Sequence, residues 1–179
     1  MPNKNLQIIQ IVGYRHSGKT TLIKKLLLKI TNEFSLRVAT LKHHGHGGEP
    51  DIVQGTDSYE HLQAGAQISG VQGEDRLHLK ITGFRNIQLE QIIALYERFP
   101  IDLLLIEGYK HAPYPKIVLL NNDADEELLD LDNIIAVGGW KRPALNNDRY
   151  PTFSIDQFSA DNYFFKQIIN DVQRRTTHE

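Results

Sequence analysis

The stretch GYRHSGKTTL, residues 13–22, fits the pattern G-x-x-x-x-G-K-[ST], which is the signature of a loop that wraps phosphates. The run LQIIQIV at 6–12 is short and rich in β-branched residues, which predicts a strand. The run TTLIKKLLLKI at 20–30 has apolar residues at helical spacing. The motif indicates phosphate binding when a strand precedes it and a helix follows it, and the sequence predicts both here. The sequence therefore predicts a nucleotide-binding loop.

The residue types in this loop match the chemistry of phosphate binding. Gly13 and Gly18 allow the chain to turn tightly enough to point backbone N–H groups inward. A helix that begins near Lys19 directs the positive end of its dipole at an anion. Lys19 can reach the outer phosphates, and the Thr20 hydroxyl can ligate magnesium. Arg15 is a further candidate for contact with the anion, because the first third of the chain is basic.

Strands and helices alternate along the rest of the chain. The run IDLLLIEG at 101–108 is almost continuously apolar, as a strand buried on both faces of a sheet should be. Further strands are expected at 36–42, 67–73, 76–81, 116–120, 133–139 and 151–155, and helices at 58–66, 89–99 and 156–175. This order predicts an α/β fold of the P-loop NTPase type, a three-layer sandwich with a mostly parallel central sheet flanked by helices. We expect one nucleotide-binding domain over residues 1–179.

The amino-acid composition argues against several classes of site and partner. The 179 residues contain no cysteine, which excludes disulfides and thiolate metal sites. The net charge of −2 and the lack of basic residues interleaved with aromatic ones argue against nucleic acid as a partner. No apolar run approaches the roughly 18 residues of a membrane span, and the N-terminus lacks the features of a secretory signal. We expect a cytoplasmic protein with no membrane partner.

Two acidic residues are candidates for magnesium and catalysis. Glu107 ends the buried run at 101–108, and carboxylates at the carboxyl ends of strands face the ligand crevice of an open α/β sheet. There it could hold magnesium or polarise an attacking water, although a solvent-facing side chain is the alternative. Asp57 lies in a long loop at 42–57 that could approach the γ-phosphate. Asp57 or Ser58 is also a plausible helix N-cap.

Four stretches together resemble one known family. GYRHSGKTTL, LKHHGH, GTDSYEHLQAGA and DLLLIEGYKHAPYPKIVLL look like the MobB proteins, which take part in forming the guanine dinucleotide form of molybdopterin cofactor. The similarity covers roughly residues 6–120, with the motifs in the family's order. Many unrelated proteins share the phosphate loop, so the resemblance rests on DSYEHLQAGA and on EGYKH followed by PKIVL.

The resemblance implies a P-loop GTPase with weak intrinsic activity. Members of this family resemble guanine-nucleotide-binding homodimers that assist the guanylyltransferase MobA. GTP and Mg²⁺ are therefore the implied cofactors, and molybdopterin is left open as a bound substrate. An [NT]-K-x-D motif for guanine would be expected after a late strand, but NIIAVGGWKRPALNND at 133–148 contains none. The preference for GTP over ATP thus rests on the resemblance alone.

Carried over by position, the resemblance assigns residues to roles. The resemblance implies that Lys19, Glu107 and Asp57 are the catalytic residues. It implies that Thr20, Glu107 and Asp57 are the magnesium ligands. The nucleotide or the pterin phosphate would be contacted by Gly13, Tyr14, Arg15, His16, Ser17, Gly18, Lys19, Thr20, Thr21, Lys42, His43, Lys110 and His111. Hydrolysis is expected to be slow, because no arginine finger is evident in cis and only Arg15 is a candidate donor in trans.

Two other function classes stay open. His43, His44 and His46 could bind a divalent metal, as in a metallochaperone GTPase that delivers nickel. Contact of these histidines with phosphate or pterin is favoured over metal binding, because the run is short and the chain lacks cysteine. A small-molecule kinase that uses ATP is the third class, with Asp57 or Glu107 as the base.

Two aromatic features have a packing interpretation. Trp140, in GGWKRP, could stack on a base or pterin ring, but packing beneath its neighbours is favoured. The C-terminal helix is expected to bury one face, formed by Phe164, Phe165, Ile168 and Ile169.

Overall fold

The computed structural model describes residues 6–44, 55–84, 86–145 and 149–158, together with residues 165, 166, 168–170 and 172. The chain divides into two compact units. The first unit contains residues 1–46 and 95–179, and the second contains residues 47–94. The expectation of one nucleotide-binding domain over the whole chain stays a prediction.

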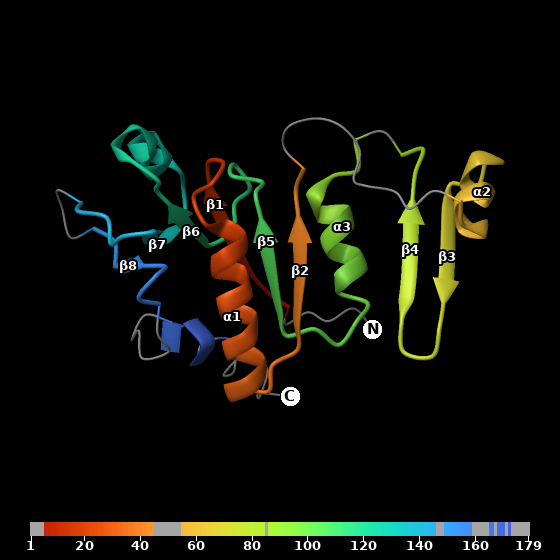
Figure 1. Cartoon of the computed structure of the whole chain (residues 1–179), viewed down its shortest axis with the longest axis horizontal. Coiled ribbons are helices and arrows are strands. Elements are labelled where there is room, and N and C mark those ends of the chain that lie inside the picture. Colours follow the sequence, from red (N-terminus) through yellow and green to blue (C-terminus); the bar gives the residue numbers. More distant parts are fainter. Residues whose placement is uncertain are drawn as a thin grey trace. The chain divides into compact units, whose positions relative to one another are not determined.

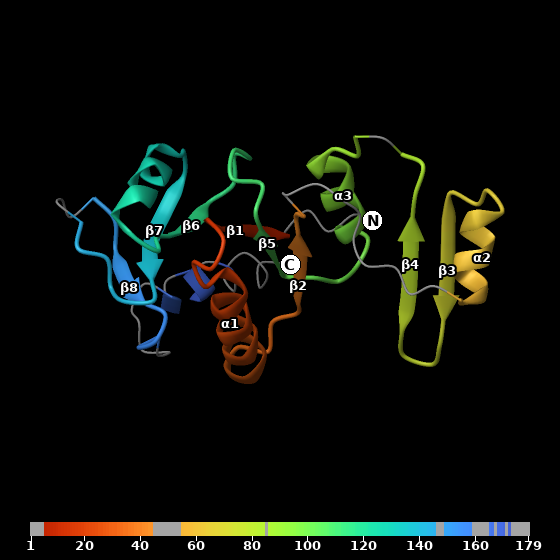
Figure 2. The same ribbon diagram turned by 45° about the horizontal axis from the view of Figure 1, so that its top comes forward.

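The first unit is built on a six-stranded parallel sheet (Figure 1). Its strands are β1 (Gln7–Gly13), β2 (Val38–Lys42), β5 (Leu103–Glu107), β6 (Lys116–Leu119), β7 (Ile134–Gly139) and β8 (Thr152–Ser154). They lie in the order β2-β5-β1-β6-β7-β8 (Figure 2). Every neighbouring pair is parallel. The mostly parallel sheet is confirmed. Because β1 lies between β5 and β6, the loop that follows it is central at the carboxyl edge of the sheet.

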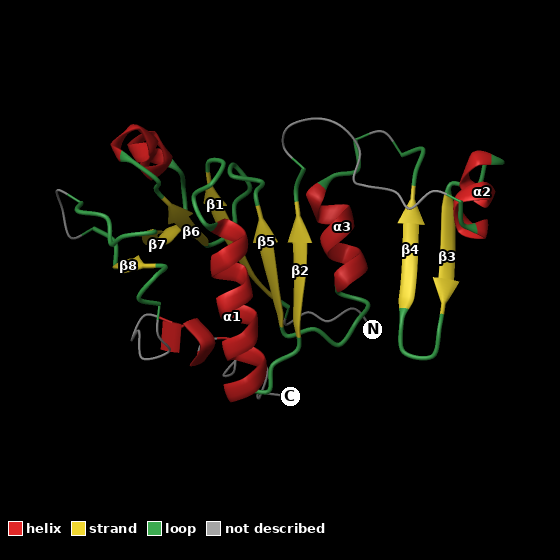
Figure 3. Ribbon diagram, in the orientation of Figure 1, coloured by secondary structure: helices red, strands yellow, loops and turns green. Residues whose placement is uncertain are grey.

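Helix α1 (Lys19–Glu33) packs its apolar face on this sheet (Figure 3). Its buried residues are Leu22, Ile23, Leu26 and Ile30, at the spacing that places side chains on one helix face. They share a core with Ile9 and Ile11 of β1. The described C-terminal helical residues join the same core through Phe165, Ile169 and Val172, and Ile168 packs at its edge. This confirms the predicted buried face, except for Phe164, which lies outside the described residues.

The opposite face of the sheet is covered by a second, smaller core. Val12, Val118 and Val137 contribute to it from three strands. The 3-10 helix η1 (Asp123–Asp130) adds Leu128, and Asn122 caps η1 by accepting from the backbone N–H of Ala124 at 2.9 Å. The sheet is therefore covered on both faces, as the predicted sandwich requires.

The second unit contains a separate two-stranded antiparallel sheet. Strands β3 (Ile68–Gln72) and β4 (Leu77–Ile81) pair with each other and follow helix α2 (Asp57–Gln63). Both strands were predicted, but not their separation from the main sheet. The predicted N-cap at Asp57 or Ser58 is wrong. Thr56 caps α2, because its extended backbone lets its hydroxyl accept from the N–H of Tyr59.

Helix α3 (Leu89–Tyr96) is shorter than the predicted 89–99. The N–H groups of Arg98 and Phe99 bond to carbonyls three residues earlier, at 3.2 and 3.0 Å. These tighter turns end the α-helix before Pro100. Of the predicted long loop at 42–57, residues 45–54 lie outside the described residues.

Candidate functional site

The phosphate loop connects β1 to α1 at the carboxyl edge of the sheet, as predicted. The Lys19 ammonium bridges the loop, donating to the carbonyls of Gly13 at 2.9 Å and Tyr14 at 2.6 Å. Burial lowers the pKa of Lys19, the charge of Glu107 opposes that shift, and Lys42 adds to it. A polyphosphate beside Lys19 would favour the charged ammonium.

The two glycines of the motif are required by space and by conformation. A Cβ at Gly13 would lie 2.5 Å from Ser17 Oγ and 2.7 Å from the Leu119 carbonyl oxygen. Gly18 has a φ of 91°, and a Cβ there would lie 2.6 Å from the Cδ1 atom of Ile155. Side chains at these positions would therefore force the loop out of shape.

Thr20 and Glu107 meet beside the loop. The Thr20 hydroxyl donates to Glu107 Oε2 at 3.2 Å, and Lys42 Nζ lies 3.5 Å from Glu107 Oε1. Glu107 is only 9% exposed, so the solvent-facing alternative for this side chain is wrong. The strand register explains the grouping, because Ile11, Lys42 and Glu107 are neighbours across β1, β2 and β5. A hydroxyl and a carboxylate are ligands that suit Mg²⁺.

The segments after β2 and β5 lie side by side at this edge. The His43 backbone N–H donates to the Glu107 carbonyl at 2.9 Å, and the His43 ring stacks on Tyr109 with centroids 4.2 Å apart. Gly108, with a φ of 101°, permits this approach, since a Cβ there would lie 3.0 Å from the Cβ of His43. Lys42 and His43 are thus placed next to Glu107, and their contact with the nucleotide or the pterin phosphate stays a prediction.

Tyr14 links the phosphate loop to two other segments. Its hydroxyl donates to Glu127 of η1, which raises the pKa of Tyr14. The ammonium of Lys110 lies over the Tyr14 ring, 5.4 Å from its centroid. Lys110 is therefore brought to the loop, while His111 is exposed in the same connecting segment.

Comparison with known proteins agrees with this geometry. The family model described as "MobB: Molybdopterin guanine dinucleotide synthesis protein B" matches residues 8–140. The chain belongs to the MobB family.

Relatives in this family carry consistent names. The "Probable molybdopterin-guanine dinucleotide biosynthesis adapter protein" of Bacillus subtilis is 40% identical over 163 residues, covering 90% of this chain and 92% of the relative. The "Molybdopterin-guanine dinucleotide biosynthesis adapter protein" of Haemophilus influenzae is 29% identical and covers 74% of each chain.

Solved MobB structures share the fold. The crystal structure of Bacillus subtilis MobB gives a TM-score of 0.74 at 36% identity, covering 97% of this chain and 99% of that one. The MobB homolog from Bacillus stearothermophilus gives 0.72 at 33% identity, covering 93% and 98%.

The other predicted site residues of this MobB-family chain are not shown in contact with the Thr20–Glu107 pair. Arg15 and His16 are exposed at the tip of the phosphate loop. Asp57 is the first residue of α2 in the second unit, so its part in magnesium binding and catalysis stays a prediction. His46 lies outside the described residues. Among the residues that are described, no group of three or more His, Cys, Asp or Glu side chains is arranged to hold a metal ion.

Sequence reasoning missed two buried polar residues that support the site. Gln10, in the centre of β1, donates to the carbonyls of Gly108 at 3.0 Å and Tyr109 at 2.7 Å. Lys116, at the start of β6, donates to the carbonyls of Ala112 at 2.9 Å and Asp132 at 2.7 Å. Burial lowers the pKa of Lys116, and the charge of Asp132 opposes that shift. The signal was a long polar side chain inside an apolar strand.

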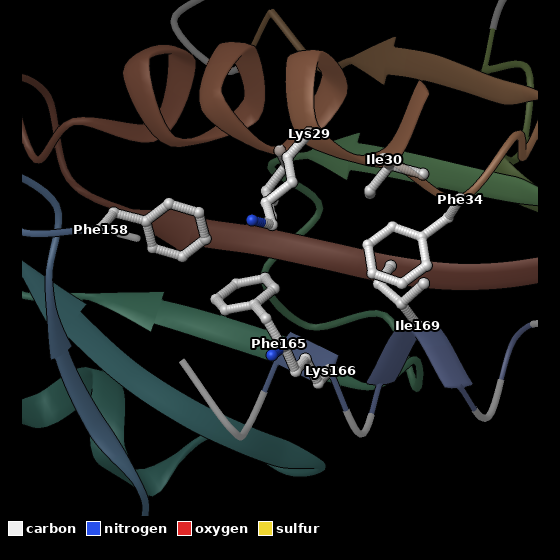
Figure 4. Close-up of a pocket in the computed structure, with 8 residues that line it drawn as sticks. Lys29, Ile30, Phe34, Phe158, Phe165, Lys166 and Ile169 are labelled. Atoms are coloured by element: carbon white, nitrogen blue, oxygen red, sulfur yellow. The ribbon is translucent and has the colours of Figure 1, made fainter. Parts of the chain in front are cut away.

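An apolar pocket lies beside the C-terminal half of α1, away from the phosphate loop (Figure 4). Ile30 and Phe34 line it from one side, and Phe165 and Ile169 from the C-terminal helix. Phe158 packs edge-on against Phe165 with centroids 4.5 Å apart. These side chains continue the main core, so the pocket is a packing feature.

No helix in the described part of the chain is long and apolar enough to cross a membrane.

Proposed function

We propose that this chain is a GTP-binding adapter protein in the synthesis of molybdopterin guanine dinucleotide. The observation that carries the proposal is the Thr20–Glu107 pair beside an intact phosphate loop. The adapter role follows the names of the relatives from Bacillus subtilis and Haemophilus influenzae. The site lies at the carboxyl edge of a parallel sheet, where open α/β folds bind their ligands.

The nucleotide phosphates are bound by the loop amides and by Lys19. Thr20 and Glu107 would hold Mg²⁺, which suits hard oxygen ligands and needs only one or two carboxylates beside the phosphates. When bound, the ion neutralises charge that develops on the phosphate oxygens. Lys42 offsets the charge of Glu107, with its ammonium 3.5 Å from the carboxylate. Asp57 is proposed as an additional magnesium ligand and catalytic group.

Hydrolysis of GTP is slow in this proposal. Glu107 either holds magnesium or polarises the attacking water, and Lys19 stabilises negative charge on the transferred phosphoryl group. Arg15 is exposed at the loop tip, where it is available to donate to a nucleotide on a second molecule. A protein of this kind uses nucleotide binding to control assembly rather than to achieve turnover.

The partners follow from the family and from two surfaces. We propose the guanylyltransferase MobA as the partner enzyme and a second copy of this chain as the dimer partner, in the cytoplasm. The apolar surface of β3 and β4 supports the homodimer, because one face of this separate sheet exposes Ile68, Leu77, Leu79 and Ile81. Lys42, His43, Lys110 and His111 supply positive charge and hydrogen-bond donors for a molybdopterin phosphate.

A competition titration tests the nucleotide assignment. GTP and ATP compete for a fluorescent GTP analogue on the purified protein, with and without magnesium. We expect GTP to be preferred, and Lys19→Ala to abolish tight binding while far-UV circular dichroism is unchanged. Lys24→Ala removes an exposed charge from the same helix and serves as the matched control. Retained affinity in Lys19→Ala would overturn the site, and a preference for ATP would favour the small-molecule kinase.

A further inference from the structure

Trp140 is held in place by the ends of two strands. It comes directly after β7, and its backbone carbonyl accepts a hydrogen bond from Ser154 Oγ at 2.7 Å. The preceding Gly139 carbonyl accepts from the N–H of Ile155 at 2.7 Å. Lys25 of α1 donates to the Ile155 carbonyl at 2.6 Å, which ties this edge of the sheet to the helix. The backbone of Trp140 therefore has a fixed position relative to the phosphate loop.

The Trp140 indole contacts the phosphate loop directly. Its Nε1 donates to the His16 carbonyl oxygen at 2.9 Å. Its Cε2 and Cζ2 atoms would lie 3.3 Å from a Cβ at Gly18, so the ring packs against the residue before α1. Trp140 as a whole is 38% exposed, so it is not fully buried. The interpretation of Trp140 as simply packed beneath its neighbours therefore omits a polar contact with the loop.

This contact acts on a strained part of the loop. His16 has a φ of 65°, a conformation that costs an ordinary residue free energy. In a trans peptide the carbonyl and the following N–H point in opposite directions. When Trp140 holds the His16 carbonyl on one side, the Ser17 N–H is directed to the other side, where it donates to the Tyr14 carbonyl at 3.3 Å. The indole and the Tyr14 carbonyl thereby fix the peptide group between His16 and Ser17 from its two sides.

We propose that Trp140 is a positioning residue that holds the phosphate loop in the shape that binds phosphates. The inference rests on the proposed nucleotide binding at this loop. Because Trp140 acts on the loop and not on the base, its effect on binding is the same for every ligand that carries a diphosphate or triphosphate group.

The experiment exploits the fact that Trp140 is the single tryptophan of the chain. Biosynthetic incorporation of benzothienylalanine replaces the indole N–H by sulfur and keeps the ring, and Trp140→Phe keeps an aromatic ring without the donor. Arg142→Gln alters the same segment at a side chain that donates to Thr152 and is the control. GTP, ATP and inorganic pyrophosphate are each titrated by calorimetry. Loss of the hydrogen bond that holds the His16 carbonyl is expected to weaken binding of all three ligands by roughly five- to tenfold.

The results distinguish a failure of the positioning role of Trp140 from a failure of nucleotide binding at the phosphate loop. Similar losses for all three ligands in both Trp140 variants, with Arg142→Gln unchanged, support it. A loss for one nucleotide with pyrophosphate unaffected would show that the ring contacts a base, and would overturn it. Unchanged affinities in the benzothienylalanine protein would also overturn it while leaving nucleotide binding intact. If the wild-type protein binds none of the ligands, the proposed function itself fails, and this inference fails with it.

Discussion

The Glu107 carboxylate contacts two side chains at the edge of the phosphate loop. One oxygen accepts from the Thr20 hydroxyl, and the other lies 3.5 Å from the Lys42 ammonium. A buried carboxylate is tolerated only when such partners offset its desolvation. This pair could be predicted, because the motif identifies Thr20 and the end of an apolar run identifies Glu107. The contact between Lys42 and Glu107 was not predicted, since the pairing of β2 with β5 cannot be read from local sequence; the resemblance implied only that Lys42 lies near the nucleotide or the pterin phosphate.

Asp102 illustrates a residue that matters for stability rather than for the site. It lies just before β5 and accepts from the Arg37 guanidinium at 2.8 and 3.0 Å, and from the Arg37 backbone N–H at 2.8 Å. The hydrogen bonds from Arg37 lower the pKa of Asp102 below its ordinary value of 3.8, although burial opposes them. This two-point contact joins the starts of β2 and β5.

We predict that Asp102→Asn destabilises the fold by about 1–2 kcal/mol at neutral pH, because charge-assisted hydrogen bonds are lost. A lowered carboxyl pKa contributes stability above the unfolded-state pKa, and this contribution is lost as pH falls through the folded-state pKa. The difference from wild type should therefore be constant above about pH 5 and shrink below the ordinary value of 3.8. Urea unfolding at a series of pH values measures it. A difference that does not shrink in acid would contradict the assignment.

At the scale of elements, the connection from β5 to β6 is unusual. β5 and β6 flank β1 on opposite sides, so residues 108–115 must cross β1 without a helix. Parallel connections usually need about a dozen residues or more. The Gln10 side chain donates to the carbonyls of Gly108 and Tyr109 in this crossing segment, and the Lys116 ammonium donates to the carbonyl of Ala112. Both strands were predicted correctly, but the crossing was not, because it depends on strand order.

We predict that Lys116→Met lowers the free energy of unfolding by about 1–3 kcal/mol. Methionine fills a similar volume, so the loss comes from the carbonyls of Ala112 and Asp132, which no longer receive a donor. Lys141→Met changes an exposed lysine and should have little effect. Chemical denaturation measures both variants. Equal stability of the two proteins would mean that Lys116 does not hold the crossing.

At the scale of the whole molecule, the chain divides into two compact units, and the expectation of one nucleotide-binding domain over residues 1–179 stays a prediction. The apolar patterns at 68–72 and 77–81 identify strands, since strand formation is locally encoded. Which sheet a strand joins depends on non-local pairing, and among the described strands β3 and β4 pair only with each other. A two-stranded sheet is marginally stable without further burial. Its exposed apolar side chains therefore support an interface with another copy of the chain.

We predict that Leu79→Glu converts a homodimer to a monomer. Leu79 is 45% exposed and shares a strand face with Leu77 and Ile81, so a carboxylate there would be buried in the proposed interface. His78→Glu places the same charge on the opposite face of β4 and is the matched control. Sedimentation velocity measures the mass. A monomeric wild-type protein, or a dimer that tolerates Leu79→Glu, would contradict this interface.

The phosphate loop, Thr20 and Glu107 are proposed to form a magnesium-dependent GTP site, and the effect of magnesium on GTP affinity tests this site. GTP is titrated by calorimetry into the wild-type protein and into Glu107→Gln, with magnesium and with a chelator. Glutamine keeps the size of the side chain and an oxygen that accepts from Thr20, but it removes the charge. We predict that magnesium tightens GTP binding to the wild type and that Glu107→Gln loses this gain while retaining its magnesium-free affinity. An equal gain from magnesium in both proteins would contradict it.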